Sequence, residues 1–267
     1  MAKFFVVSDV HGFHSELMEA LDKAGFNPEI NNHYLISCGD EFDRGPEALY
    51  TYEYLRSLAK RGKAIVLKGN HTMFLTEYLS GKTLSPFNYQ FNGTRETLAD
   101  FLGQTAPFET WCVLQHIEQP TYGDFAKWIC EARKEINEDY PDLLEWMETR
   151  PYYFETKNYI FTHGAIDGTC KDWHFPKKDA WGRFMGWEAC MWDDGSFFGS
   201  EIINTEKTVV IGHFGTQQLR EMYDIQDGND PYGILYREDG KVIAIDATTK
   251  LTNRVNVLVI EDDLMEE

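Results

Sequence analysis

The first eighty residues alternate between short continuous hydrophobic runs and segments with helical periodicity. Residues 3–7 form an uninterrupted run rich in β-branched and aromatic side chains, which is typical of a strand buried on both faces. Strands of the same kind follow at residues 34–37 and 63–67, and a predicted helix comes after each strand. The first of these helices, residues 15–24, would carry on its apolar face Leu17, Met18, Leu21 and Ala24. This threefold repeat of strand, polar loop and helix predicts a parallel sheet covered by helices.

The pattern changes in the middle of the chain. Residues 84–150 are rich in Trp and Phe and are interrupted by prolines. Their periodicity predicts several helices, among them residues 122–137 and 142–147. We expect a helical insertion that lies over the edge of the sheet or over an active-site cleft.

Four further strands are predicted in the second half of the chain. Residues 159–162 and 208–211 each run into a motif that pairs His with Gly. Residues 242–245 and 255–260 are predicted to close a second sheet. No repeat or flexible linker interrupts residues 1–267, so we expect a single domain that contains the insertion.

Composition adds limits to this picture. Hydrophobic residues make up 43% of the 267 residues and aromatic residues 15%, which is enough for a large buried core. No stretch approaches the roughly 20 apolar residues that a membrane-spanning helix needs, so we expect no membrane partner. The chain runs directly from Met1 into the first predicted strand, which favours a cytoplasmic protein without a signal peptide.

Charge restricts the partners further. The formal net charge of −19 repels a phosphate backbone, so we expect no nucleic-acid partner. An anionic small substrate would meet the same repulsion unless bound divalent cations reversed the local field.

Polar residues follow the predicted strands at the edge where the carboxyl ends of parallel strands meet. Their carboxylate, imidazole and amide groups suit Mn²⁺, Fe²⁺ or Zn²⁺. Each short motif is common by itself, but the order D-x-H, G-D-x-x-D-R-G, G-N-H, H-G and G-H after successive strands favours a metal site. The candidate residues are Asp9, His11, Asp40, Asp43, Arg44, Asn70, His71, His163 and His213.

This ordered set resembles the phosphoprotein phosphatase family of the calcineurin-like metallophosphoesterases. Within that family it is similar to the bacterial and phage branch, which includes the lambda-phage protein phosphatase and the symmetrical diadenosine tetraphosphatases. The resemblance covers about residues 3–81 and 159–260, and residues 91–98, F-N-G-T-R-E-T-L, also resemble a segment of that branch. It implies an α/β (α+β) fold, a four-layer αββα sandwich of two mixed β-sheets with a helical insertion.

The resemblance also implies two divalent metal ions, Mn²⁺ first of all, with Fe or Zn as alternatives. A hydroxide that bridges the two ions would attack phosphorus in line. The first ion would be held by Asp9, His11 and Asp40, and the second by Asp40, Asn70, His163 and His213.

The resemblance implies roles for three more residues. His71 would be the general acid that protonates the leaving oxygen, Asp43 would orient it, and Arg44 would bind the phosphate with its guanidinium group. Without the resemblance, Arg44 would be interpreted as a surface salt-bridge residue and Asp43 as a loop cap.

The sequence also departs from the family pattern near the expected phosphate. Thr72 stands where the family often has Glu, and Lys68 where it often has Arg. Asp194 occupies the place of a further phosphate-binding Arg, for which Arg183 is a candidate replacement. Gly215 follows the last motif where many phosphodiesterases and nucleases carry a second His, which favours the monoesterase branch.

Three functions are therefore weighed. The leading hypothesis is a metal-dependent phosphatase of phosphomonoesters, including phosphoprotein Ser/Thr, so that the partner is a phosphorylated substrate. The second is hydrolysis of a dinucleoside polyphosphate such as diadenosine tetraphosphate. The third is a catalytically weak module that binds a phosphorylated ligand.

Overall fold

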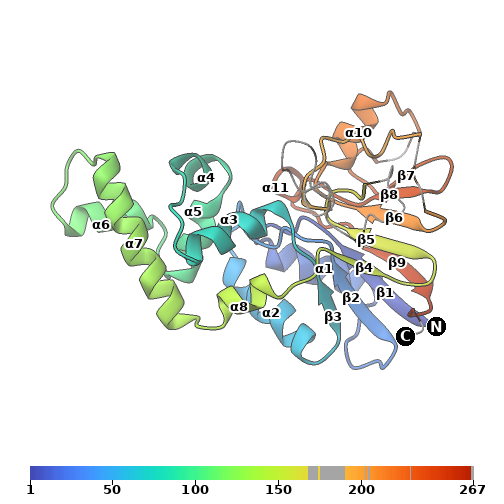
Figure 1. The fold of residues 1–267 in the computed structure, drawn as a ribbon, viewed down its shortest axis with the longest axis horizontal. Helices are drawn as coiled ribbons and strands as arrows, with labels where there is room; N and C mark the ends of the chain where they lie inside the picture. Colours follow the sequence, from blue (N-terminus) through green and yellow to red (C-terminus); the bar gives the residue numbers. More distant parts are fainter. Residues whose placement is uncertain (168–173, 175–189, 202, 204, 229, 266–267) are drawn as a thin grey trace.

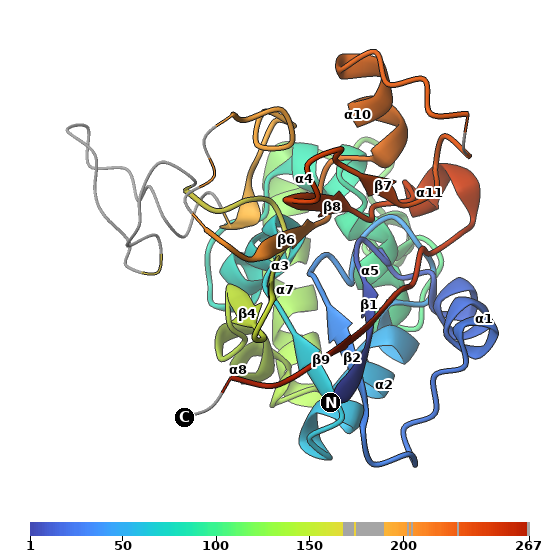
Figure 2. The ribbon, with the colours of Figure 1, turned by 90° about the vertical axis from the view of Figure 1, so that its right-hand side faces the viewer.

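The computed structural model describes residues 1–167, 174, 190–201, 203, 205–228 and 230–265. In this part of the chain two β-sheets lie face to face, with helices outside them (Figures 1 and 2). The first sheet has the order β3 (Ala64–Val66), β2 (His33–Ser37), β1 (Ala2–Val7) and β9 (Leu258–Asp262). The second has the order β4 (Tyr153–Glu155), β5 (Tyr159–Thr162), β6 (Thr208–Ile211), β8 (Val242–Ala244) and β7 (Leu235–Tyr236).

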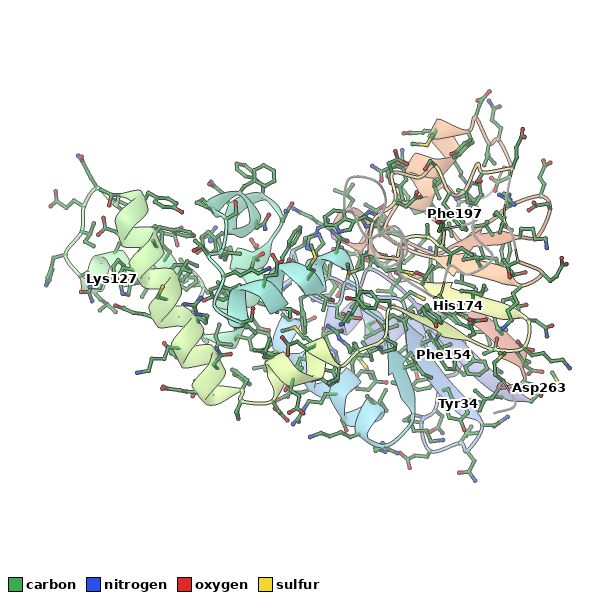
Figure 3. The ribbon with its side chains drawn as sticks, viewed as in Figure 1. Tyr34, Lys127, Phe154, His174, Phe197 and Asp263 are labelled. Carbon is green, nitrogen blue, oxygen red and sulfur yellow. The ribbon has the colours of Figure 1, made fainter. Side chains whose placement is uncertain are left out.

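Alternation along β1 explains why the strand is buried on both faces. Phe4 and Val6 point toward the second sheet and pack with residues such as Phe161. Phe5 and Val7 point the other way, toward the helices α1 (His14–Ala24) and α2 (Ala48–Lys60). Figure 3 labels Phe154 and Tyr34, whose rings lie 6.4 Å and 5.8 Å from that of Phe4 between the sheets.

The outer face of the second sheet is covered in the same manner. Val209 and Ile211 of β6 pack with Leu219 of α10 (Thr216–Met222), on the side away from the first sheet. A short helix, α11 (Thr249–Thr252), follows β8. The layers are therefore helix, sheet, sheet and helix, and the predicted αββα sandwich of two mixed sheets is confirmed.

Two details differ from the sequence predictions. The last strand, β9, was expected in the second sheet, but it pairs antiparallel with β1 of the first sheet. Its hydrophobic pattern identifies it as a strand but carries no information about which edge it joins. Met18 of α1 is 38% exposed, because the buried face of that helix is centred on Leu17 and Leu21.

Helices fill most of the segment predicted as an insertion. They are α4 (Pro86–Phe91), α5 (Thr94–Phe101), α6 (Pro107–Leu114), α7 (Tyr122–Asp139) and α8 (Leu143–Glu148), beside α3 (Asn70–Leu79) (Figure 1). Their aromatic core includes Phe125 and Trp128, and it continues onto Tyr52 of α2 and Tyr78 of α3. That residues 1–267 form a single domain with an insertion stays a prediction. No helix in the described residues is both long and apolar enough to span a membrane.

Candidate metal centre and active site

The loops that follow β1 and β2 are hydrogen-bonded to each other, and the loop after β6 is bonded to the loop after β1. The amide of Asp9 donates to the Gly39 carbonyl at 3.1 Å, and the amide of His11 donates to the Asp40 carbonyl at 2.9 Å. The amide of His213 donates to the Asp9 carboxylate at 2.8 Å. The structure therefore gathers the predicted candidates from both sheets at one place, where the parallel strands end.

Backbone strain is concentrated in these loops. Six of the nine candidates have a positive φ, a conformation that is uncommon for residues other than glycine. Such strain costs free energy and collects at functional sites, where surrounding contacts maintain it. The φ angles are 53° at Asp9, 50° at His11, 56° at Asp40, 71° at Asp43, 72° at Arg44 and 63° at His213.

Two motif glycines are required by close packing. A Cβ atom on Gly69 would lie 2.1 Å from Oδ1 of Asp40, and one on Gly212 would lie 1.8 Å from Oγ of Ser8. Both distances are far below van der Waals contact. These glycines allow the loops to approach closely enough for their neighbours to meet.

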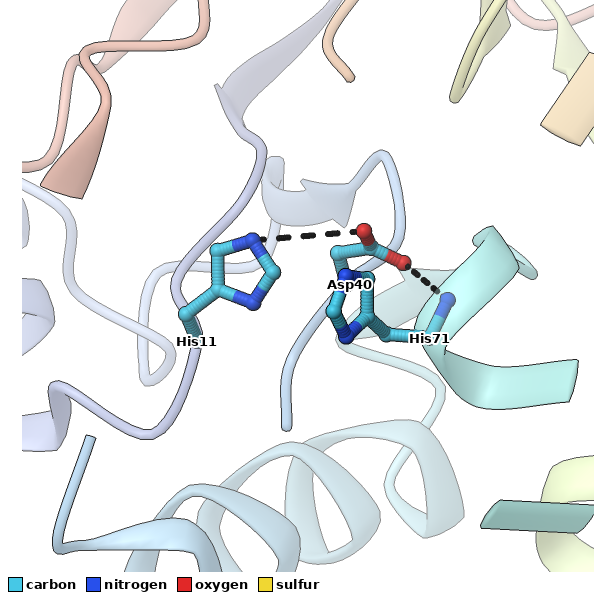
Figure 4. A group of neighbouring side chains, drawn as sticks. All are labelled: His11, Asp40 and His71. Atoms are coloured by element: carbon cyan, nitrogen blue, oxygen red, sulfur yellow. Dashed lines mark hydrogen bonds and ion pairs between the residues drawn. The ribbon is translucent and has the colours of Figure 1, made fainter. Parts of the chain in front are cut away.

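Asp40 lies at the centre of the cluster. Its Oδ2 is 3.2 Å from Nε2 of His163. The same oxygen lies 4.0 Å from Nε2 of His11, while Oδ1 accepts the backbone N–H of His71 at 3.0 Å (Figure 4). Burial disfavours ionisation of this carboxyl group, but the neighbouring histidines, His163 most of all, outweigh it and hold the pKa of Asp40 well below its usual value. Asp40 is thus an anion placed between histidines.

His11 presents an unpartnered ring nitrogen to this anion. Its Nδ1 donates to the Phe42 carbonyl at 2.8 Å, which leaves the lone pair on Nε2. Nε2 is buried and has no hydrogen-bond partner among the described residues. Burial, together with Arg44 and His71, lowers the pKa of His11 well below its usual value, so the ring is neutral. A neutral imidazole oriented by a backbone carbonyl is the usual form of a metal ligand.

His163 faces three oxygen acceptors. Its Nδ1 lies 2.9 Å from the Cys38 carbonyl, and its Nε2 lies 2.9 Å from Oδ1 of Asn70 and 3.2 Å from the Asp40 carboxylate. Burial lowers the pKa of His163, but Asp40 and Asp9 outweigh burial and raise it to about 9. A carboxylate, an amide oxygen and an imidazole that converge in this way have the chemistry of a divalent-cation site.

Asp9 and His213 complete the cluster. Asp9 accepts a hydrogen bond from Oγ of Ser8 at 2.5 Å, and its other oxygen lies 3.8 Å from Nε2 of His11. Burial raises the pKa of Asp9, and burial together with the nearby His163 lowers that of His213 to about 4. Neutral His213 therefore offers a lone pair next to His163, whose ring lies 5.0 Å away.

The potential ligand atoms form two groups that share Asp40. One is His11, Asp40 and His71, and the other is Asp40, His163 and His213, with the atoms of each group within 4.8 Å of one another. This donor set fits two divalent cations. His71 is the exception, because the partners of its two ring nitrogens belong to neither group.

Those partners are the other two candidates, Asp43 and Arg44. Nδ1 of His71 lies 2.7 Å from Oδ2 of Asp43, and Nε2 lies 3.1 Å from Nη2 of Arg44. A guanidinium group only donates, so Nε2 accepts and the proton of the neutral ring is on Nδ1. The structure thus places His71 beside the proposed metal ligands, paired with an acid on one side and a cation on the other.

Aromatic rings border the cluster. The ring of Trp192 lies 5.7 Å from that of His213 and 5.8 Å from that of Phe74, which in turn lies 5.5 Å from the ring of His71. Trp192 is 41% exposed, so it lies at the solvent side of the site.

Of the residues proposed to replace the family's arginines, the structure describes Lys68. Nζ of Lys68 lies 4.5 Å from the centre of the Tyr152 ring, and burial lowers the pKa of this lysine. Arg183 lies outside the described residues. Asp194 is hydrogen-bonded to the backbone N–H of Ser196 at 3.1 Å.

Sequence reasoning missed several polar residues at the site. Glu41, inside the G-D-x-x-D-R-G motif, is fully buried and pairs with Arg150 at 2.7 Å, and Arg150 also donates to the hydroxyl of Thr72 at 3.2 Å. Arg150 therefore contacts Thr72, the residue that stands where the family often has Glu. Asp246 follows β8 as Asp9 follows β1, and that shared position was the signal that could have found it.

A family model described as calcineurin-like phosphoesterase matches residues 2–245. This chain belongs to that family. Calcineurin-like phosphoesterases use divalent metals, in agreement with the donor set around Asp40.

Curated relatives each match only part of this chain. A symmetrical bis(5'-nucleosyl)-tetraphosphatase of Shewanella sp. (strain ANA-3) is 41% identical over 75 residues, which are 28% of this chain and 26% of the relative. An asymmetrical bis(5'-nucleosyl)-tetraphosphatase of Halalkalibacterium halodurans is 33% identical over 86 residues, which are 30% of this chain and 35% of the relative. The chain therefore spans about a third or less of the length of these relatives.

A solved structure resembles the whole chain. The cold-active protein-tyrosine phosphatase of a psychrophilic Shewanella species has a TM-score of 0.59 and 18% identity, over 98% of this chain and 76% of that one. At this identity the likeness supports the fold alone.

Proposed function

We propose that this phosphoesterase hydrolyses phosphomonoesters, including phosphoserine and phosphothreonine in proteins. The observation that carries the proposal is that His71, paired with Asp43 and in contact with Arg44, lies directly against Asp40 of the metal-ligand cluster. A group that can give up a proton and a group that can bind a phosphate are thus next to the ligands for two cations.

Two divalent cations fit the donor set, with Mn²⁺ as the first choice. Asp9, His11 and Asp40 would hold one cation, and Asp40 with three further residues, Asn70, His163 and His213, would hold the second. When bound, the cations neutralise phosphate charge and lower the pKa of water.

The protein's own residues would bind the phosphate and protonate the leaving oxygen. The Arg44 guanidinium group suits two oxygens of a phosphate, and a bound phosphate would draw it away from Nε2 of His71. Once Nε2 carries a proton, His71 can pass it to the leaving oxygen. Asp43 accepts the Nδ1–H of His71 throughout and keeps the ring oriented.

A second candidate function is hydrolysis of dinucleoside polyphosphates. The curated relatives carry that activity in their names, and the helices of residues 84–150 contain a cavity of about 320 Å³. Its walls include Phe108, Tyr122 and Phe125, against which a base could stack, and Arg95, which could contact a phosphate. Arg95 follows Thr94, whose hydroxyl lies 3.4 Å from Asp43.

A substrate panel on Mn²⁺-loaded protein separates these candidates. It would contain an aryl phosphate, an aryl phosphodiester, a phosphothreonine peptide and diadenosine tetraphosphate, with His71→Asn as the control. Fast turnover of the monoester and the peptide supports the first function, and preference for the dinucleotide supports the second. Two bound metals without turnover of any substrate would contradict both and leave a phospho-ligand binding module.

A further inference from the structure

Two buried threonines of α5 contact the carboxylate that orients His71. The hydroxyl of Thr97 donates to Oδ1 of Asp43 at 3.0 Å and accepts the backbone N–H of Asp43 at 2.7 Å. The hydroxyl of Thr94 lies 3.4 Å from Oδ2 of Asp43, the oxygen that also pairs with His71. Thr94 and Thr97 are fully buried and, three residues apart, share one face of the helix.

These hydrogen bonds leave little freedom to the Asp43 carboxylate. An ionised carboxylate only accepts hydrogen bonds, and a threonine hydroxyl has a single proton to give. The Thr97 hydroxyl accepts the backbone N–H of Asp43 with a lone pair, and it donates its one proton to Oδ1 of the same residue. Both carboxylate oxygens are thus held, and Oδ2 is turned toward Nδ1 of His71.

The start of α5 also supports the backbone of the next residue, Arg44. The Arg44 amide donates to the Gly93 carbonyl at 3.1 Å. Gly93 has a φ of 90°, and a Cβ atom on it would lie 2.3 Å from the Arg44 nitrogen. Asp43 and Arg44 are consecutive non-glycine residues in the left-handed region, which is costly unless neighbouring contacts hold it. Gly93, Thr94 and Thr97 supply contacts of that kind.

We propose that Thr97, assisted by Thr94 and Gly93, is a positioning residue that holds the Asp43–His71 pair in the orientation needed for proton transfer to the leaving group. The inference rests on the proposed function, because it takes His71 as the general acid. It assigns to the segment predicted as an insertion an indirect share in the chemistry, through residues that contact Asp43 and Arg44.

The test compares Thr97→Val, which keeps the shape and loses the hydroxyl, with Thr97→Ser, which keeps the hydroxyl. Thr51→Val is the matched control, because Thr51 is equally buried but its hydroxyl, among the described residues, bonds only to the Glu47 carbonyl, at 2.9 Å. Each metal-loaded variant is assayed for kcat and KM on a series of aryl phosphates whose leaving groups differ in basicity. Metal content and folding are measured in parallel.

A positioning role affects the basic leaving groups most, because these need the proton. We expect Thr97→Val to lower kcat on phenyl phosphate roughly ten- to a hundredfold, and on 4-nitrophenyl phosphate much less. KM and metal content should stay unchanged, Thr97→Ser should restore kcat, and Thr51→Val should match the wild type. An equal loss of kcat for every leaving group, or a loss that Thr97→Ser does not restore, would overturn the proposal.

A spectroscopic measurement distinguishes failure of this inference from failure of the proposed function. In Zn²⁺-loaded protein, the Nδ1–H of His71 should give a downfield proton resonance because it is bonded to Asp43, and that resonance is assigned with His71→Asn. We expect Thr97→Val to shift or broaden it and Thr97→Ser to retain it. If the wild type hydrolyses no phosphoester while the resonance responds in this way, the function fails and the positioning role stands. A resonance unchanged in Thr97→Val would overturn the positioning role.

Discussion

The loops at the strand ends and the helices of residues 84–150 hold their polar side chains in different ways. The loops place Asp9, His11 and Asp40 in left-handed conformations, and they leave Nε2 of His11 buried without a described partner. The helices place Thr94 and Thr97 in ordinary helical conformations, with both hydroxyls directed at Asp43. The loops thus concentrate strain and hold a buried imidazole nitrogen without a described partner, whereas the Thr94 and Thr97 hydroxyls of α5 make satisfied contacts.

Under the proposed function, this difference separates the groups that react from the groups that support them. Strain and unpartnered polar atoms persist only where something else compensates for them, such as a bound ion or a substrate. Satisfied hydrogen bonds stabilise the apo protein as well as the active form. Changes in the loops should therefore act mainly on metal binding and turnover, and changes among the helices mainly on stability and on the orientation of the acid.

The largest effect is expected for Asp40→Ala, because Asp40 belongs to both ligand groups. We expect kcat on an aryl phosphate to fall by roughly 10³-fold or more, since residues that merely orient ligands already change metal affinity about 10–100-fold. Elemental analysis of the purified protein should show that both metals are lost. The control is Glu138→Gln, which removes a surface charge on α7. Retention of two metals by Asp40→Ala would disprove the shared-ligand assignment.

His71→Asn should separate chemistry from metal binding. Asn cannot act as a general acid, so kcat should fall about 10²–10⁴-fold. Both of the His71 ring nitrogens have protein partners, so the metal content should remain that of the wild type. Steady-state kinetics and elemental analysis on the same preparation check the two halves of this prediction. Loss of a metal would move His71 into the ligand set, as the grouping with His11 and Asp40 would then imply.

Substitution of Glu41 tests how much its ion pair with Arg150, which follows α8, stabilises the loops. Glu41→Leu would leave Arg150 with a buried charge and no carboxylate partner, and we expect the free energy of unfolding to fall by about 3–5 kcal/mol. Urea denaturation of the apo protein measures this. The double variant Glu41→Leu/Arg150→Met should recover most of the loss, because it removes both charges. A double variant as unstable as the single one would show that the pair is not the cause.

Much of this arrangement could be predicted from the sequence, because it depends on local signals. Strands 159–162 and 208–211 coincide with β5 and β6, and the motifs that follow the strands contain the nine candidates that the structure brings together. Periodicity and motif order are local properties, and the carboxyl ends of parallel strands must meet. The assignment of roles to the nine residues came from the family resemblance and stays a prediction.

The remainder depends on which distant segments meet. Thr97 is 54 residues from Asp43, and Arg150 is 109 residues from Glu41, so neither contact has a local signature. The prediction that the last strand joins the second sheet was wrong for the same reason, since an edge strand shows its periodicity but not its partner. Residues 91–98 resemble a segment of the family, but only the position of α5 shows that Thr94 and Thr97 within it contact Asp43.

The smallest effect is expected at the junction of the two regions. Tyr78 of α3, the helix that begins at Asn70, donates its hydroxyl to the Ile129 carbonyl of α7 at 2.9 Å, and its ring is 1% exposed. In Tyr78→Phe the ring is kept and the carbonyl retains its helical partner, so we expect only about 0.5–1.5 kcal/mol of stability to be lost. Urea denaturation measures that loss, while kcat, KM and metal content should equal those of the wild type. Tyr78→Leu, which also removes the ring, should cost more stability and still leave the metal content unchanged. If Tyr78→Phe lowered kcat severalfold, the helices would influence turnover through α3 as well as through α5, and the separation between reacting loops and supporting helices would fail at this contact.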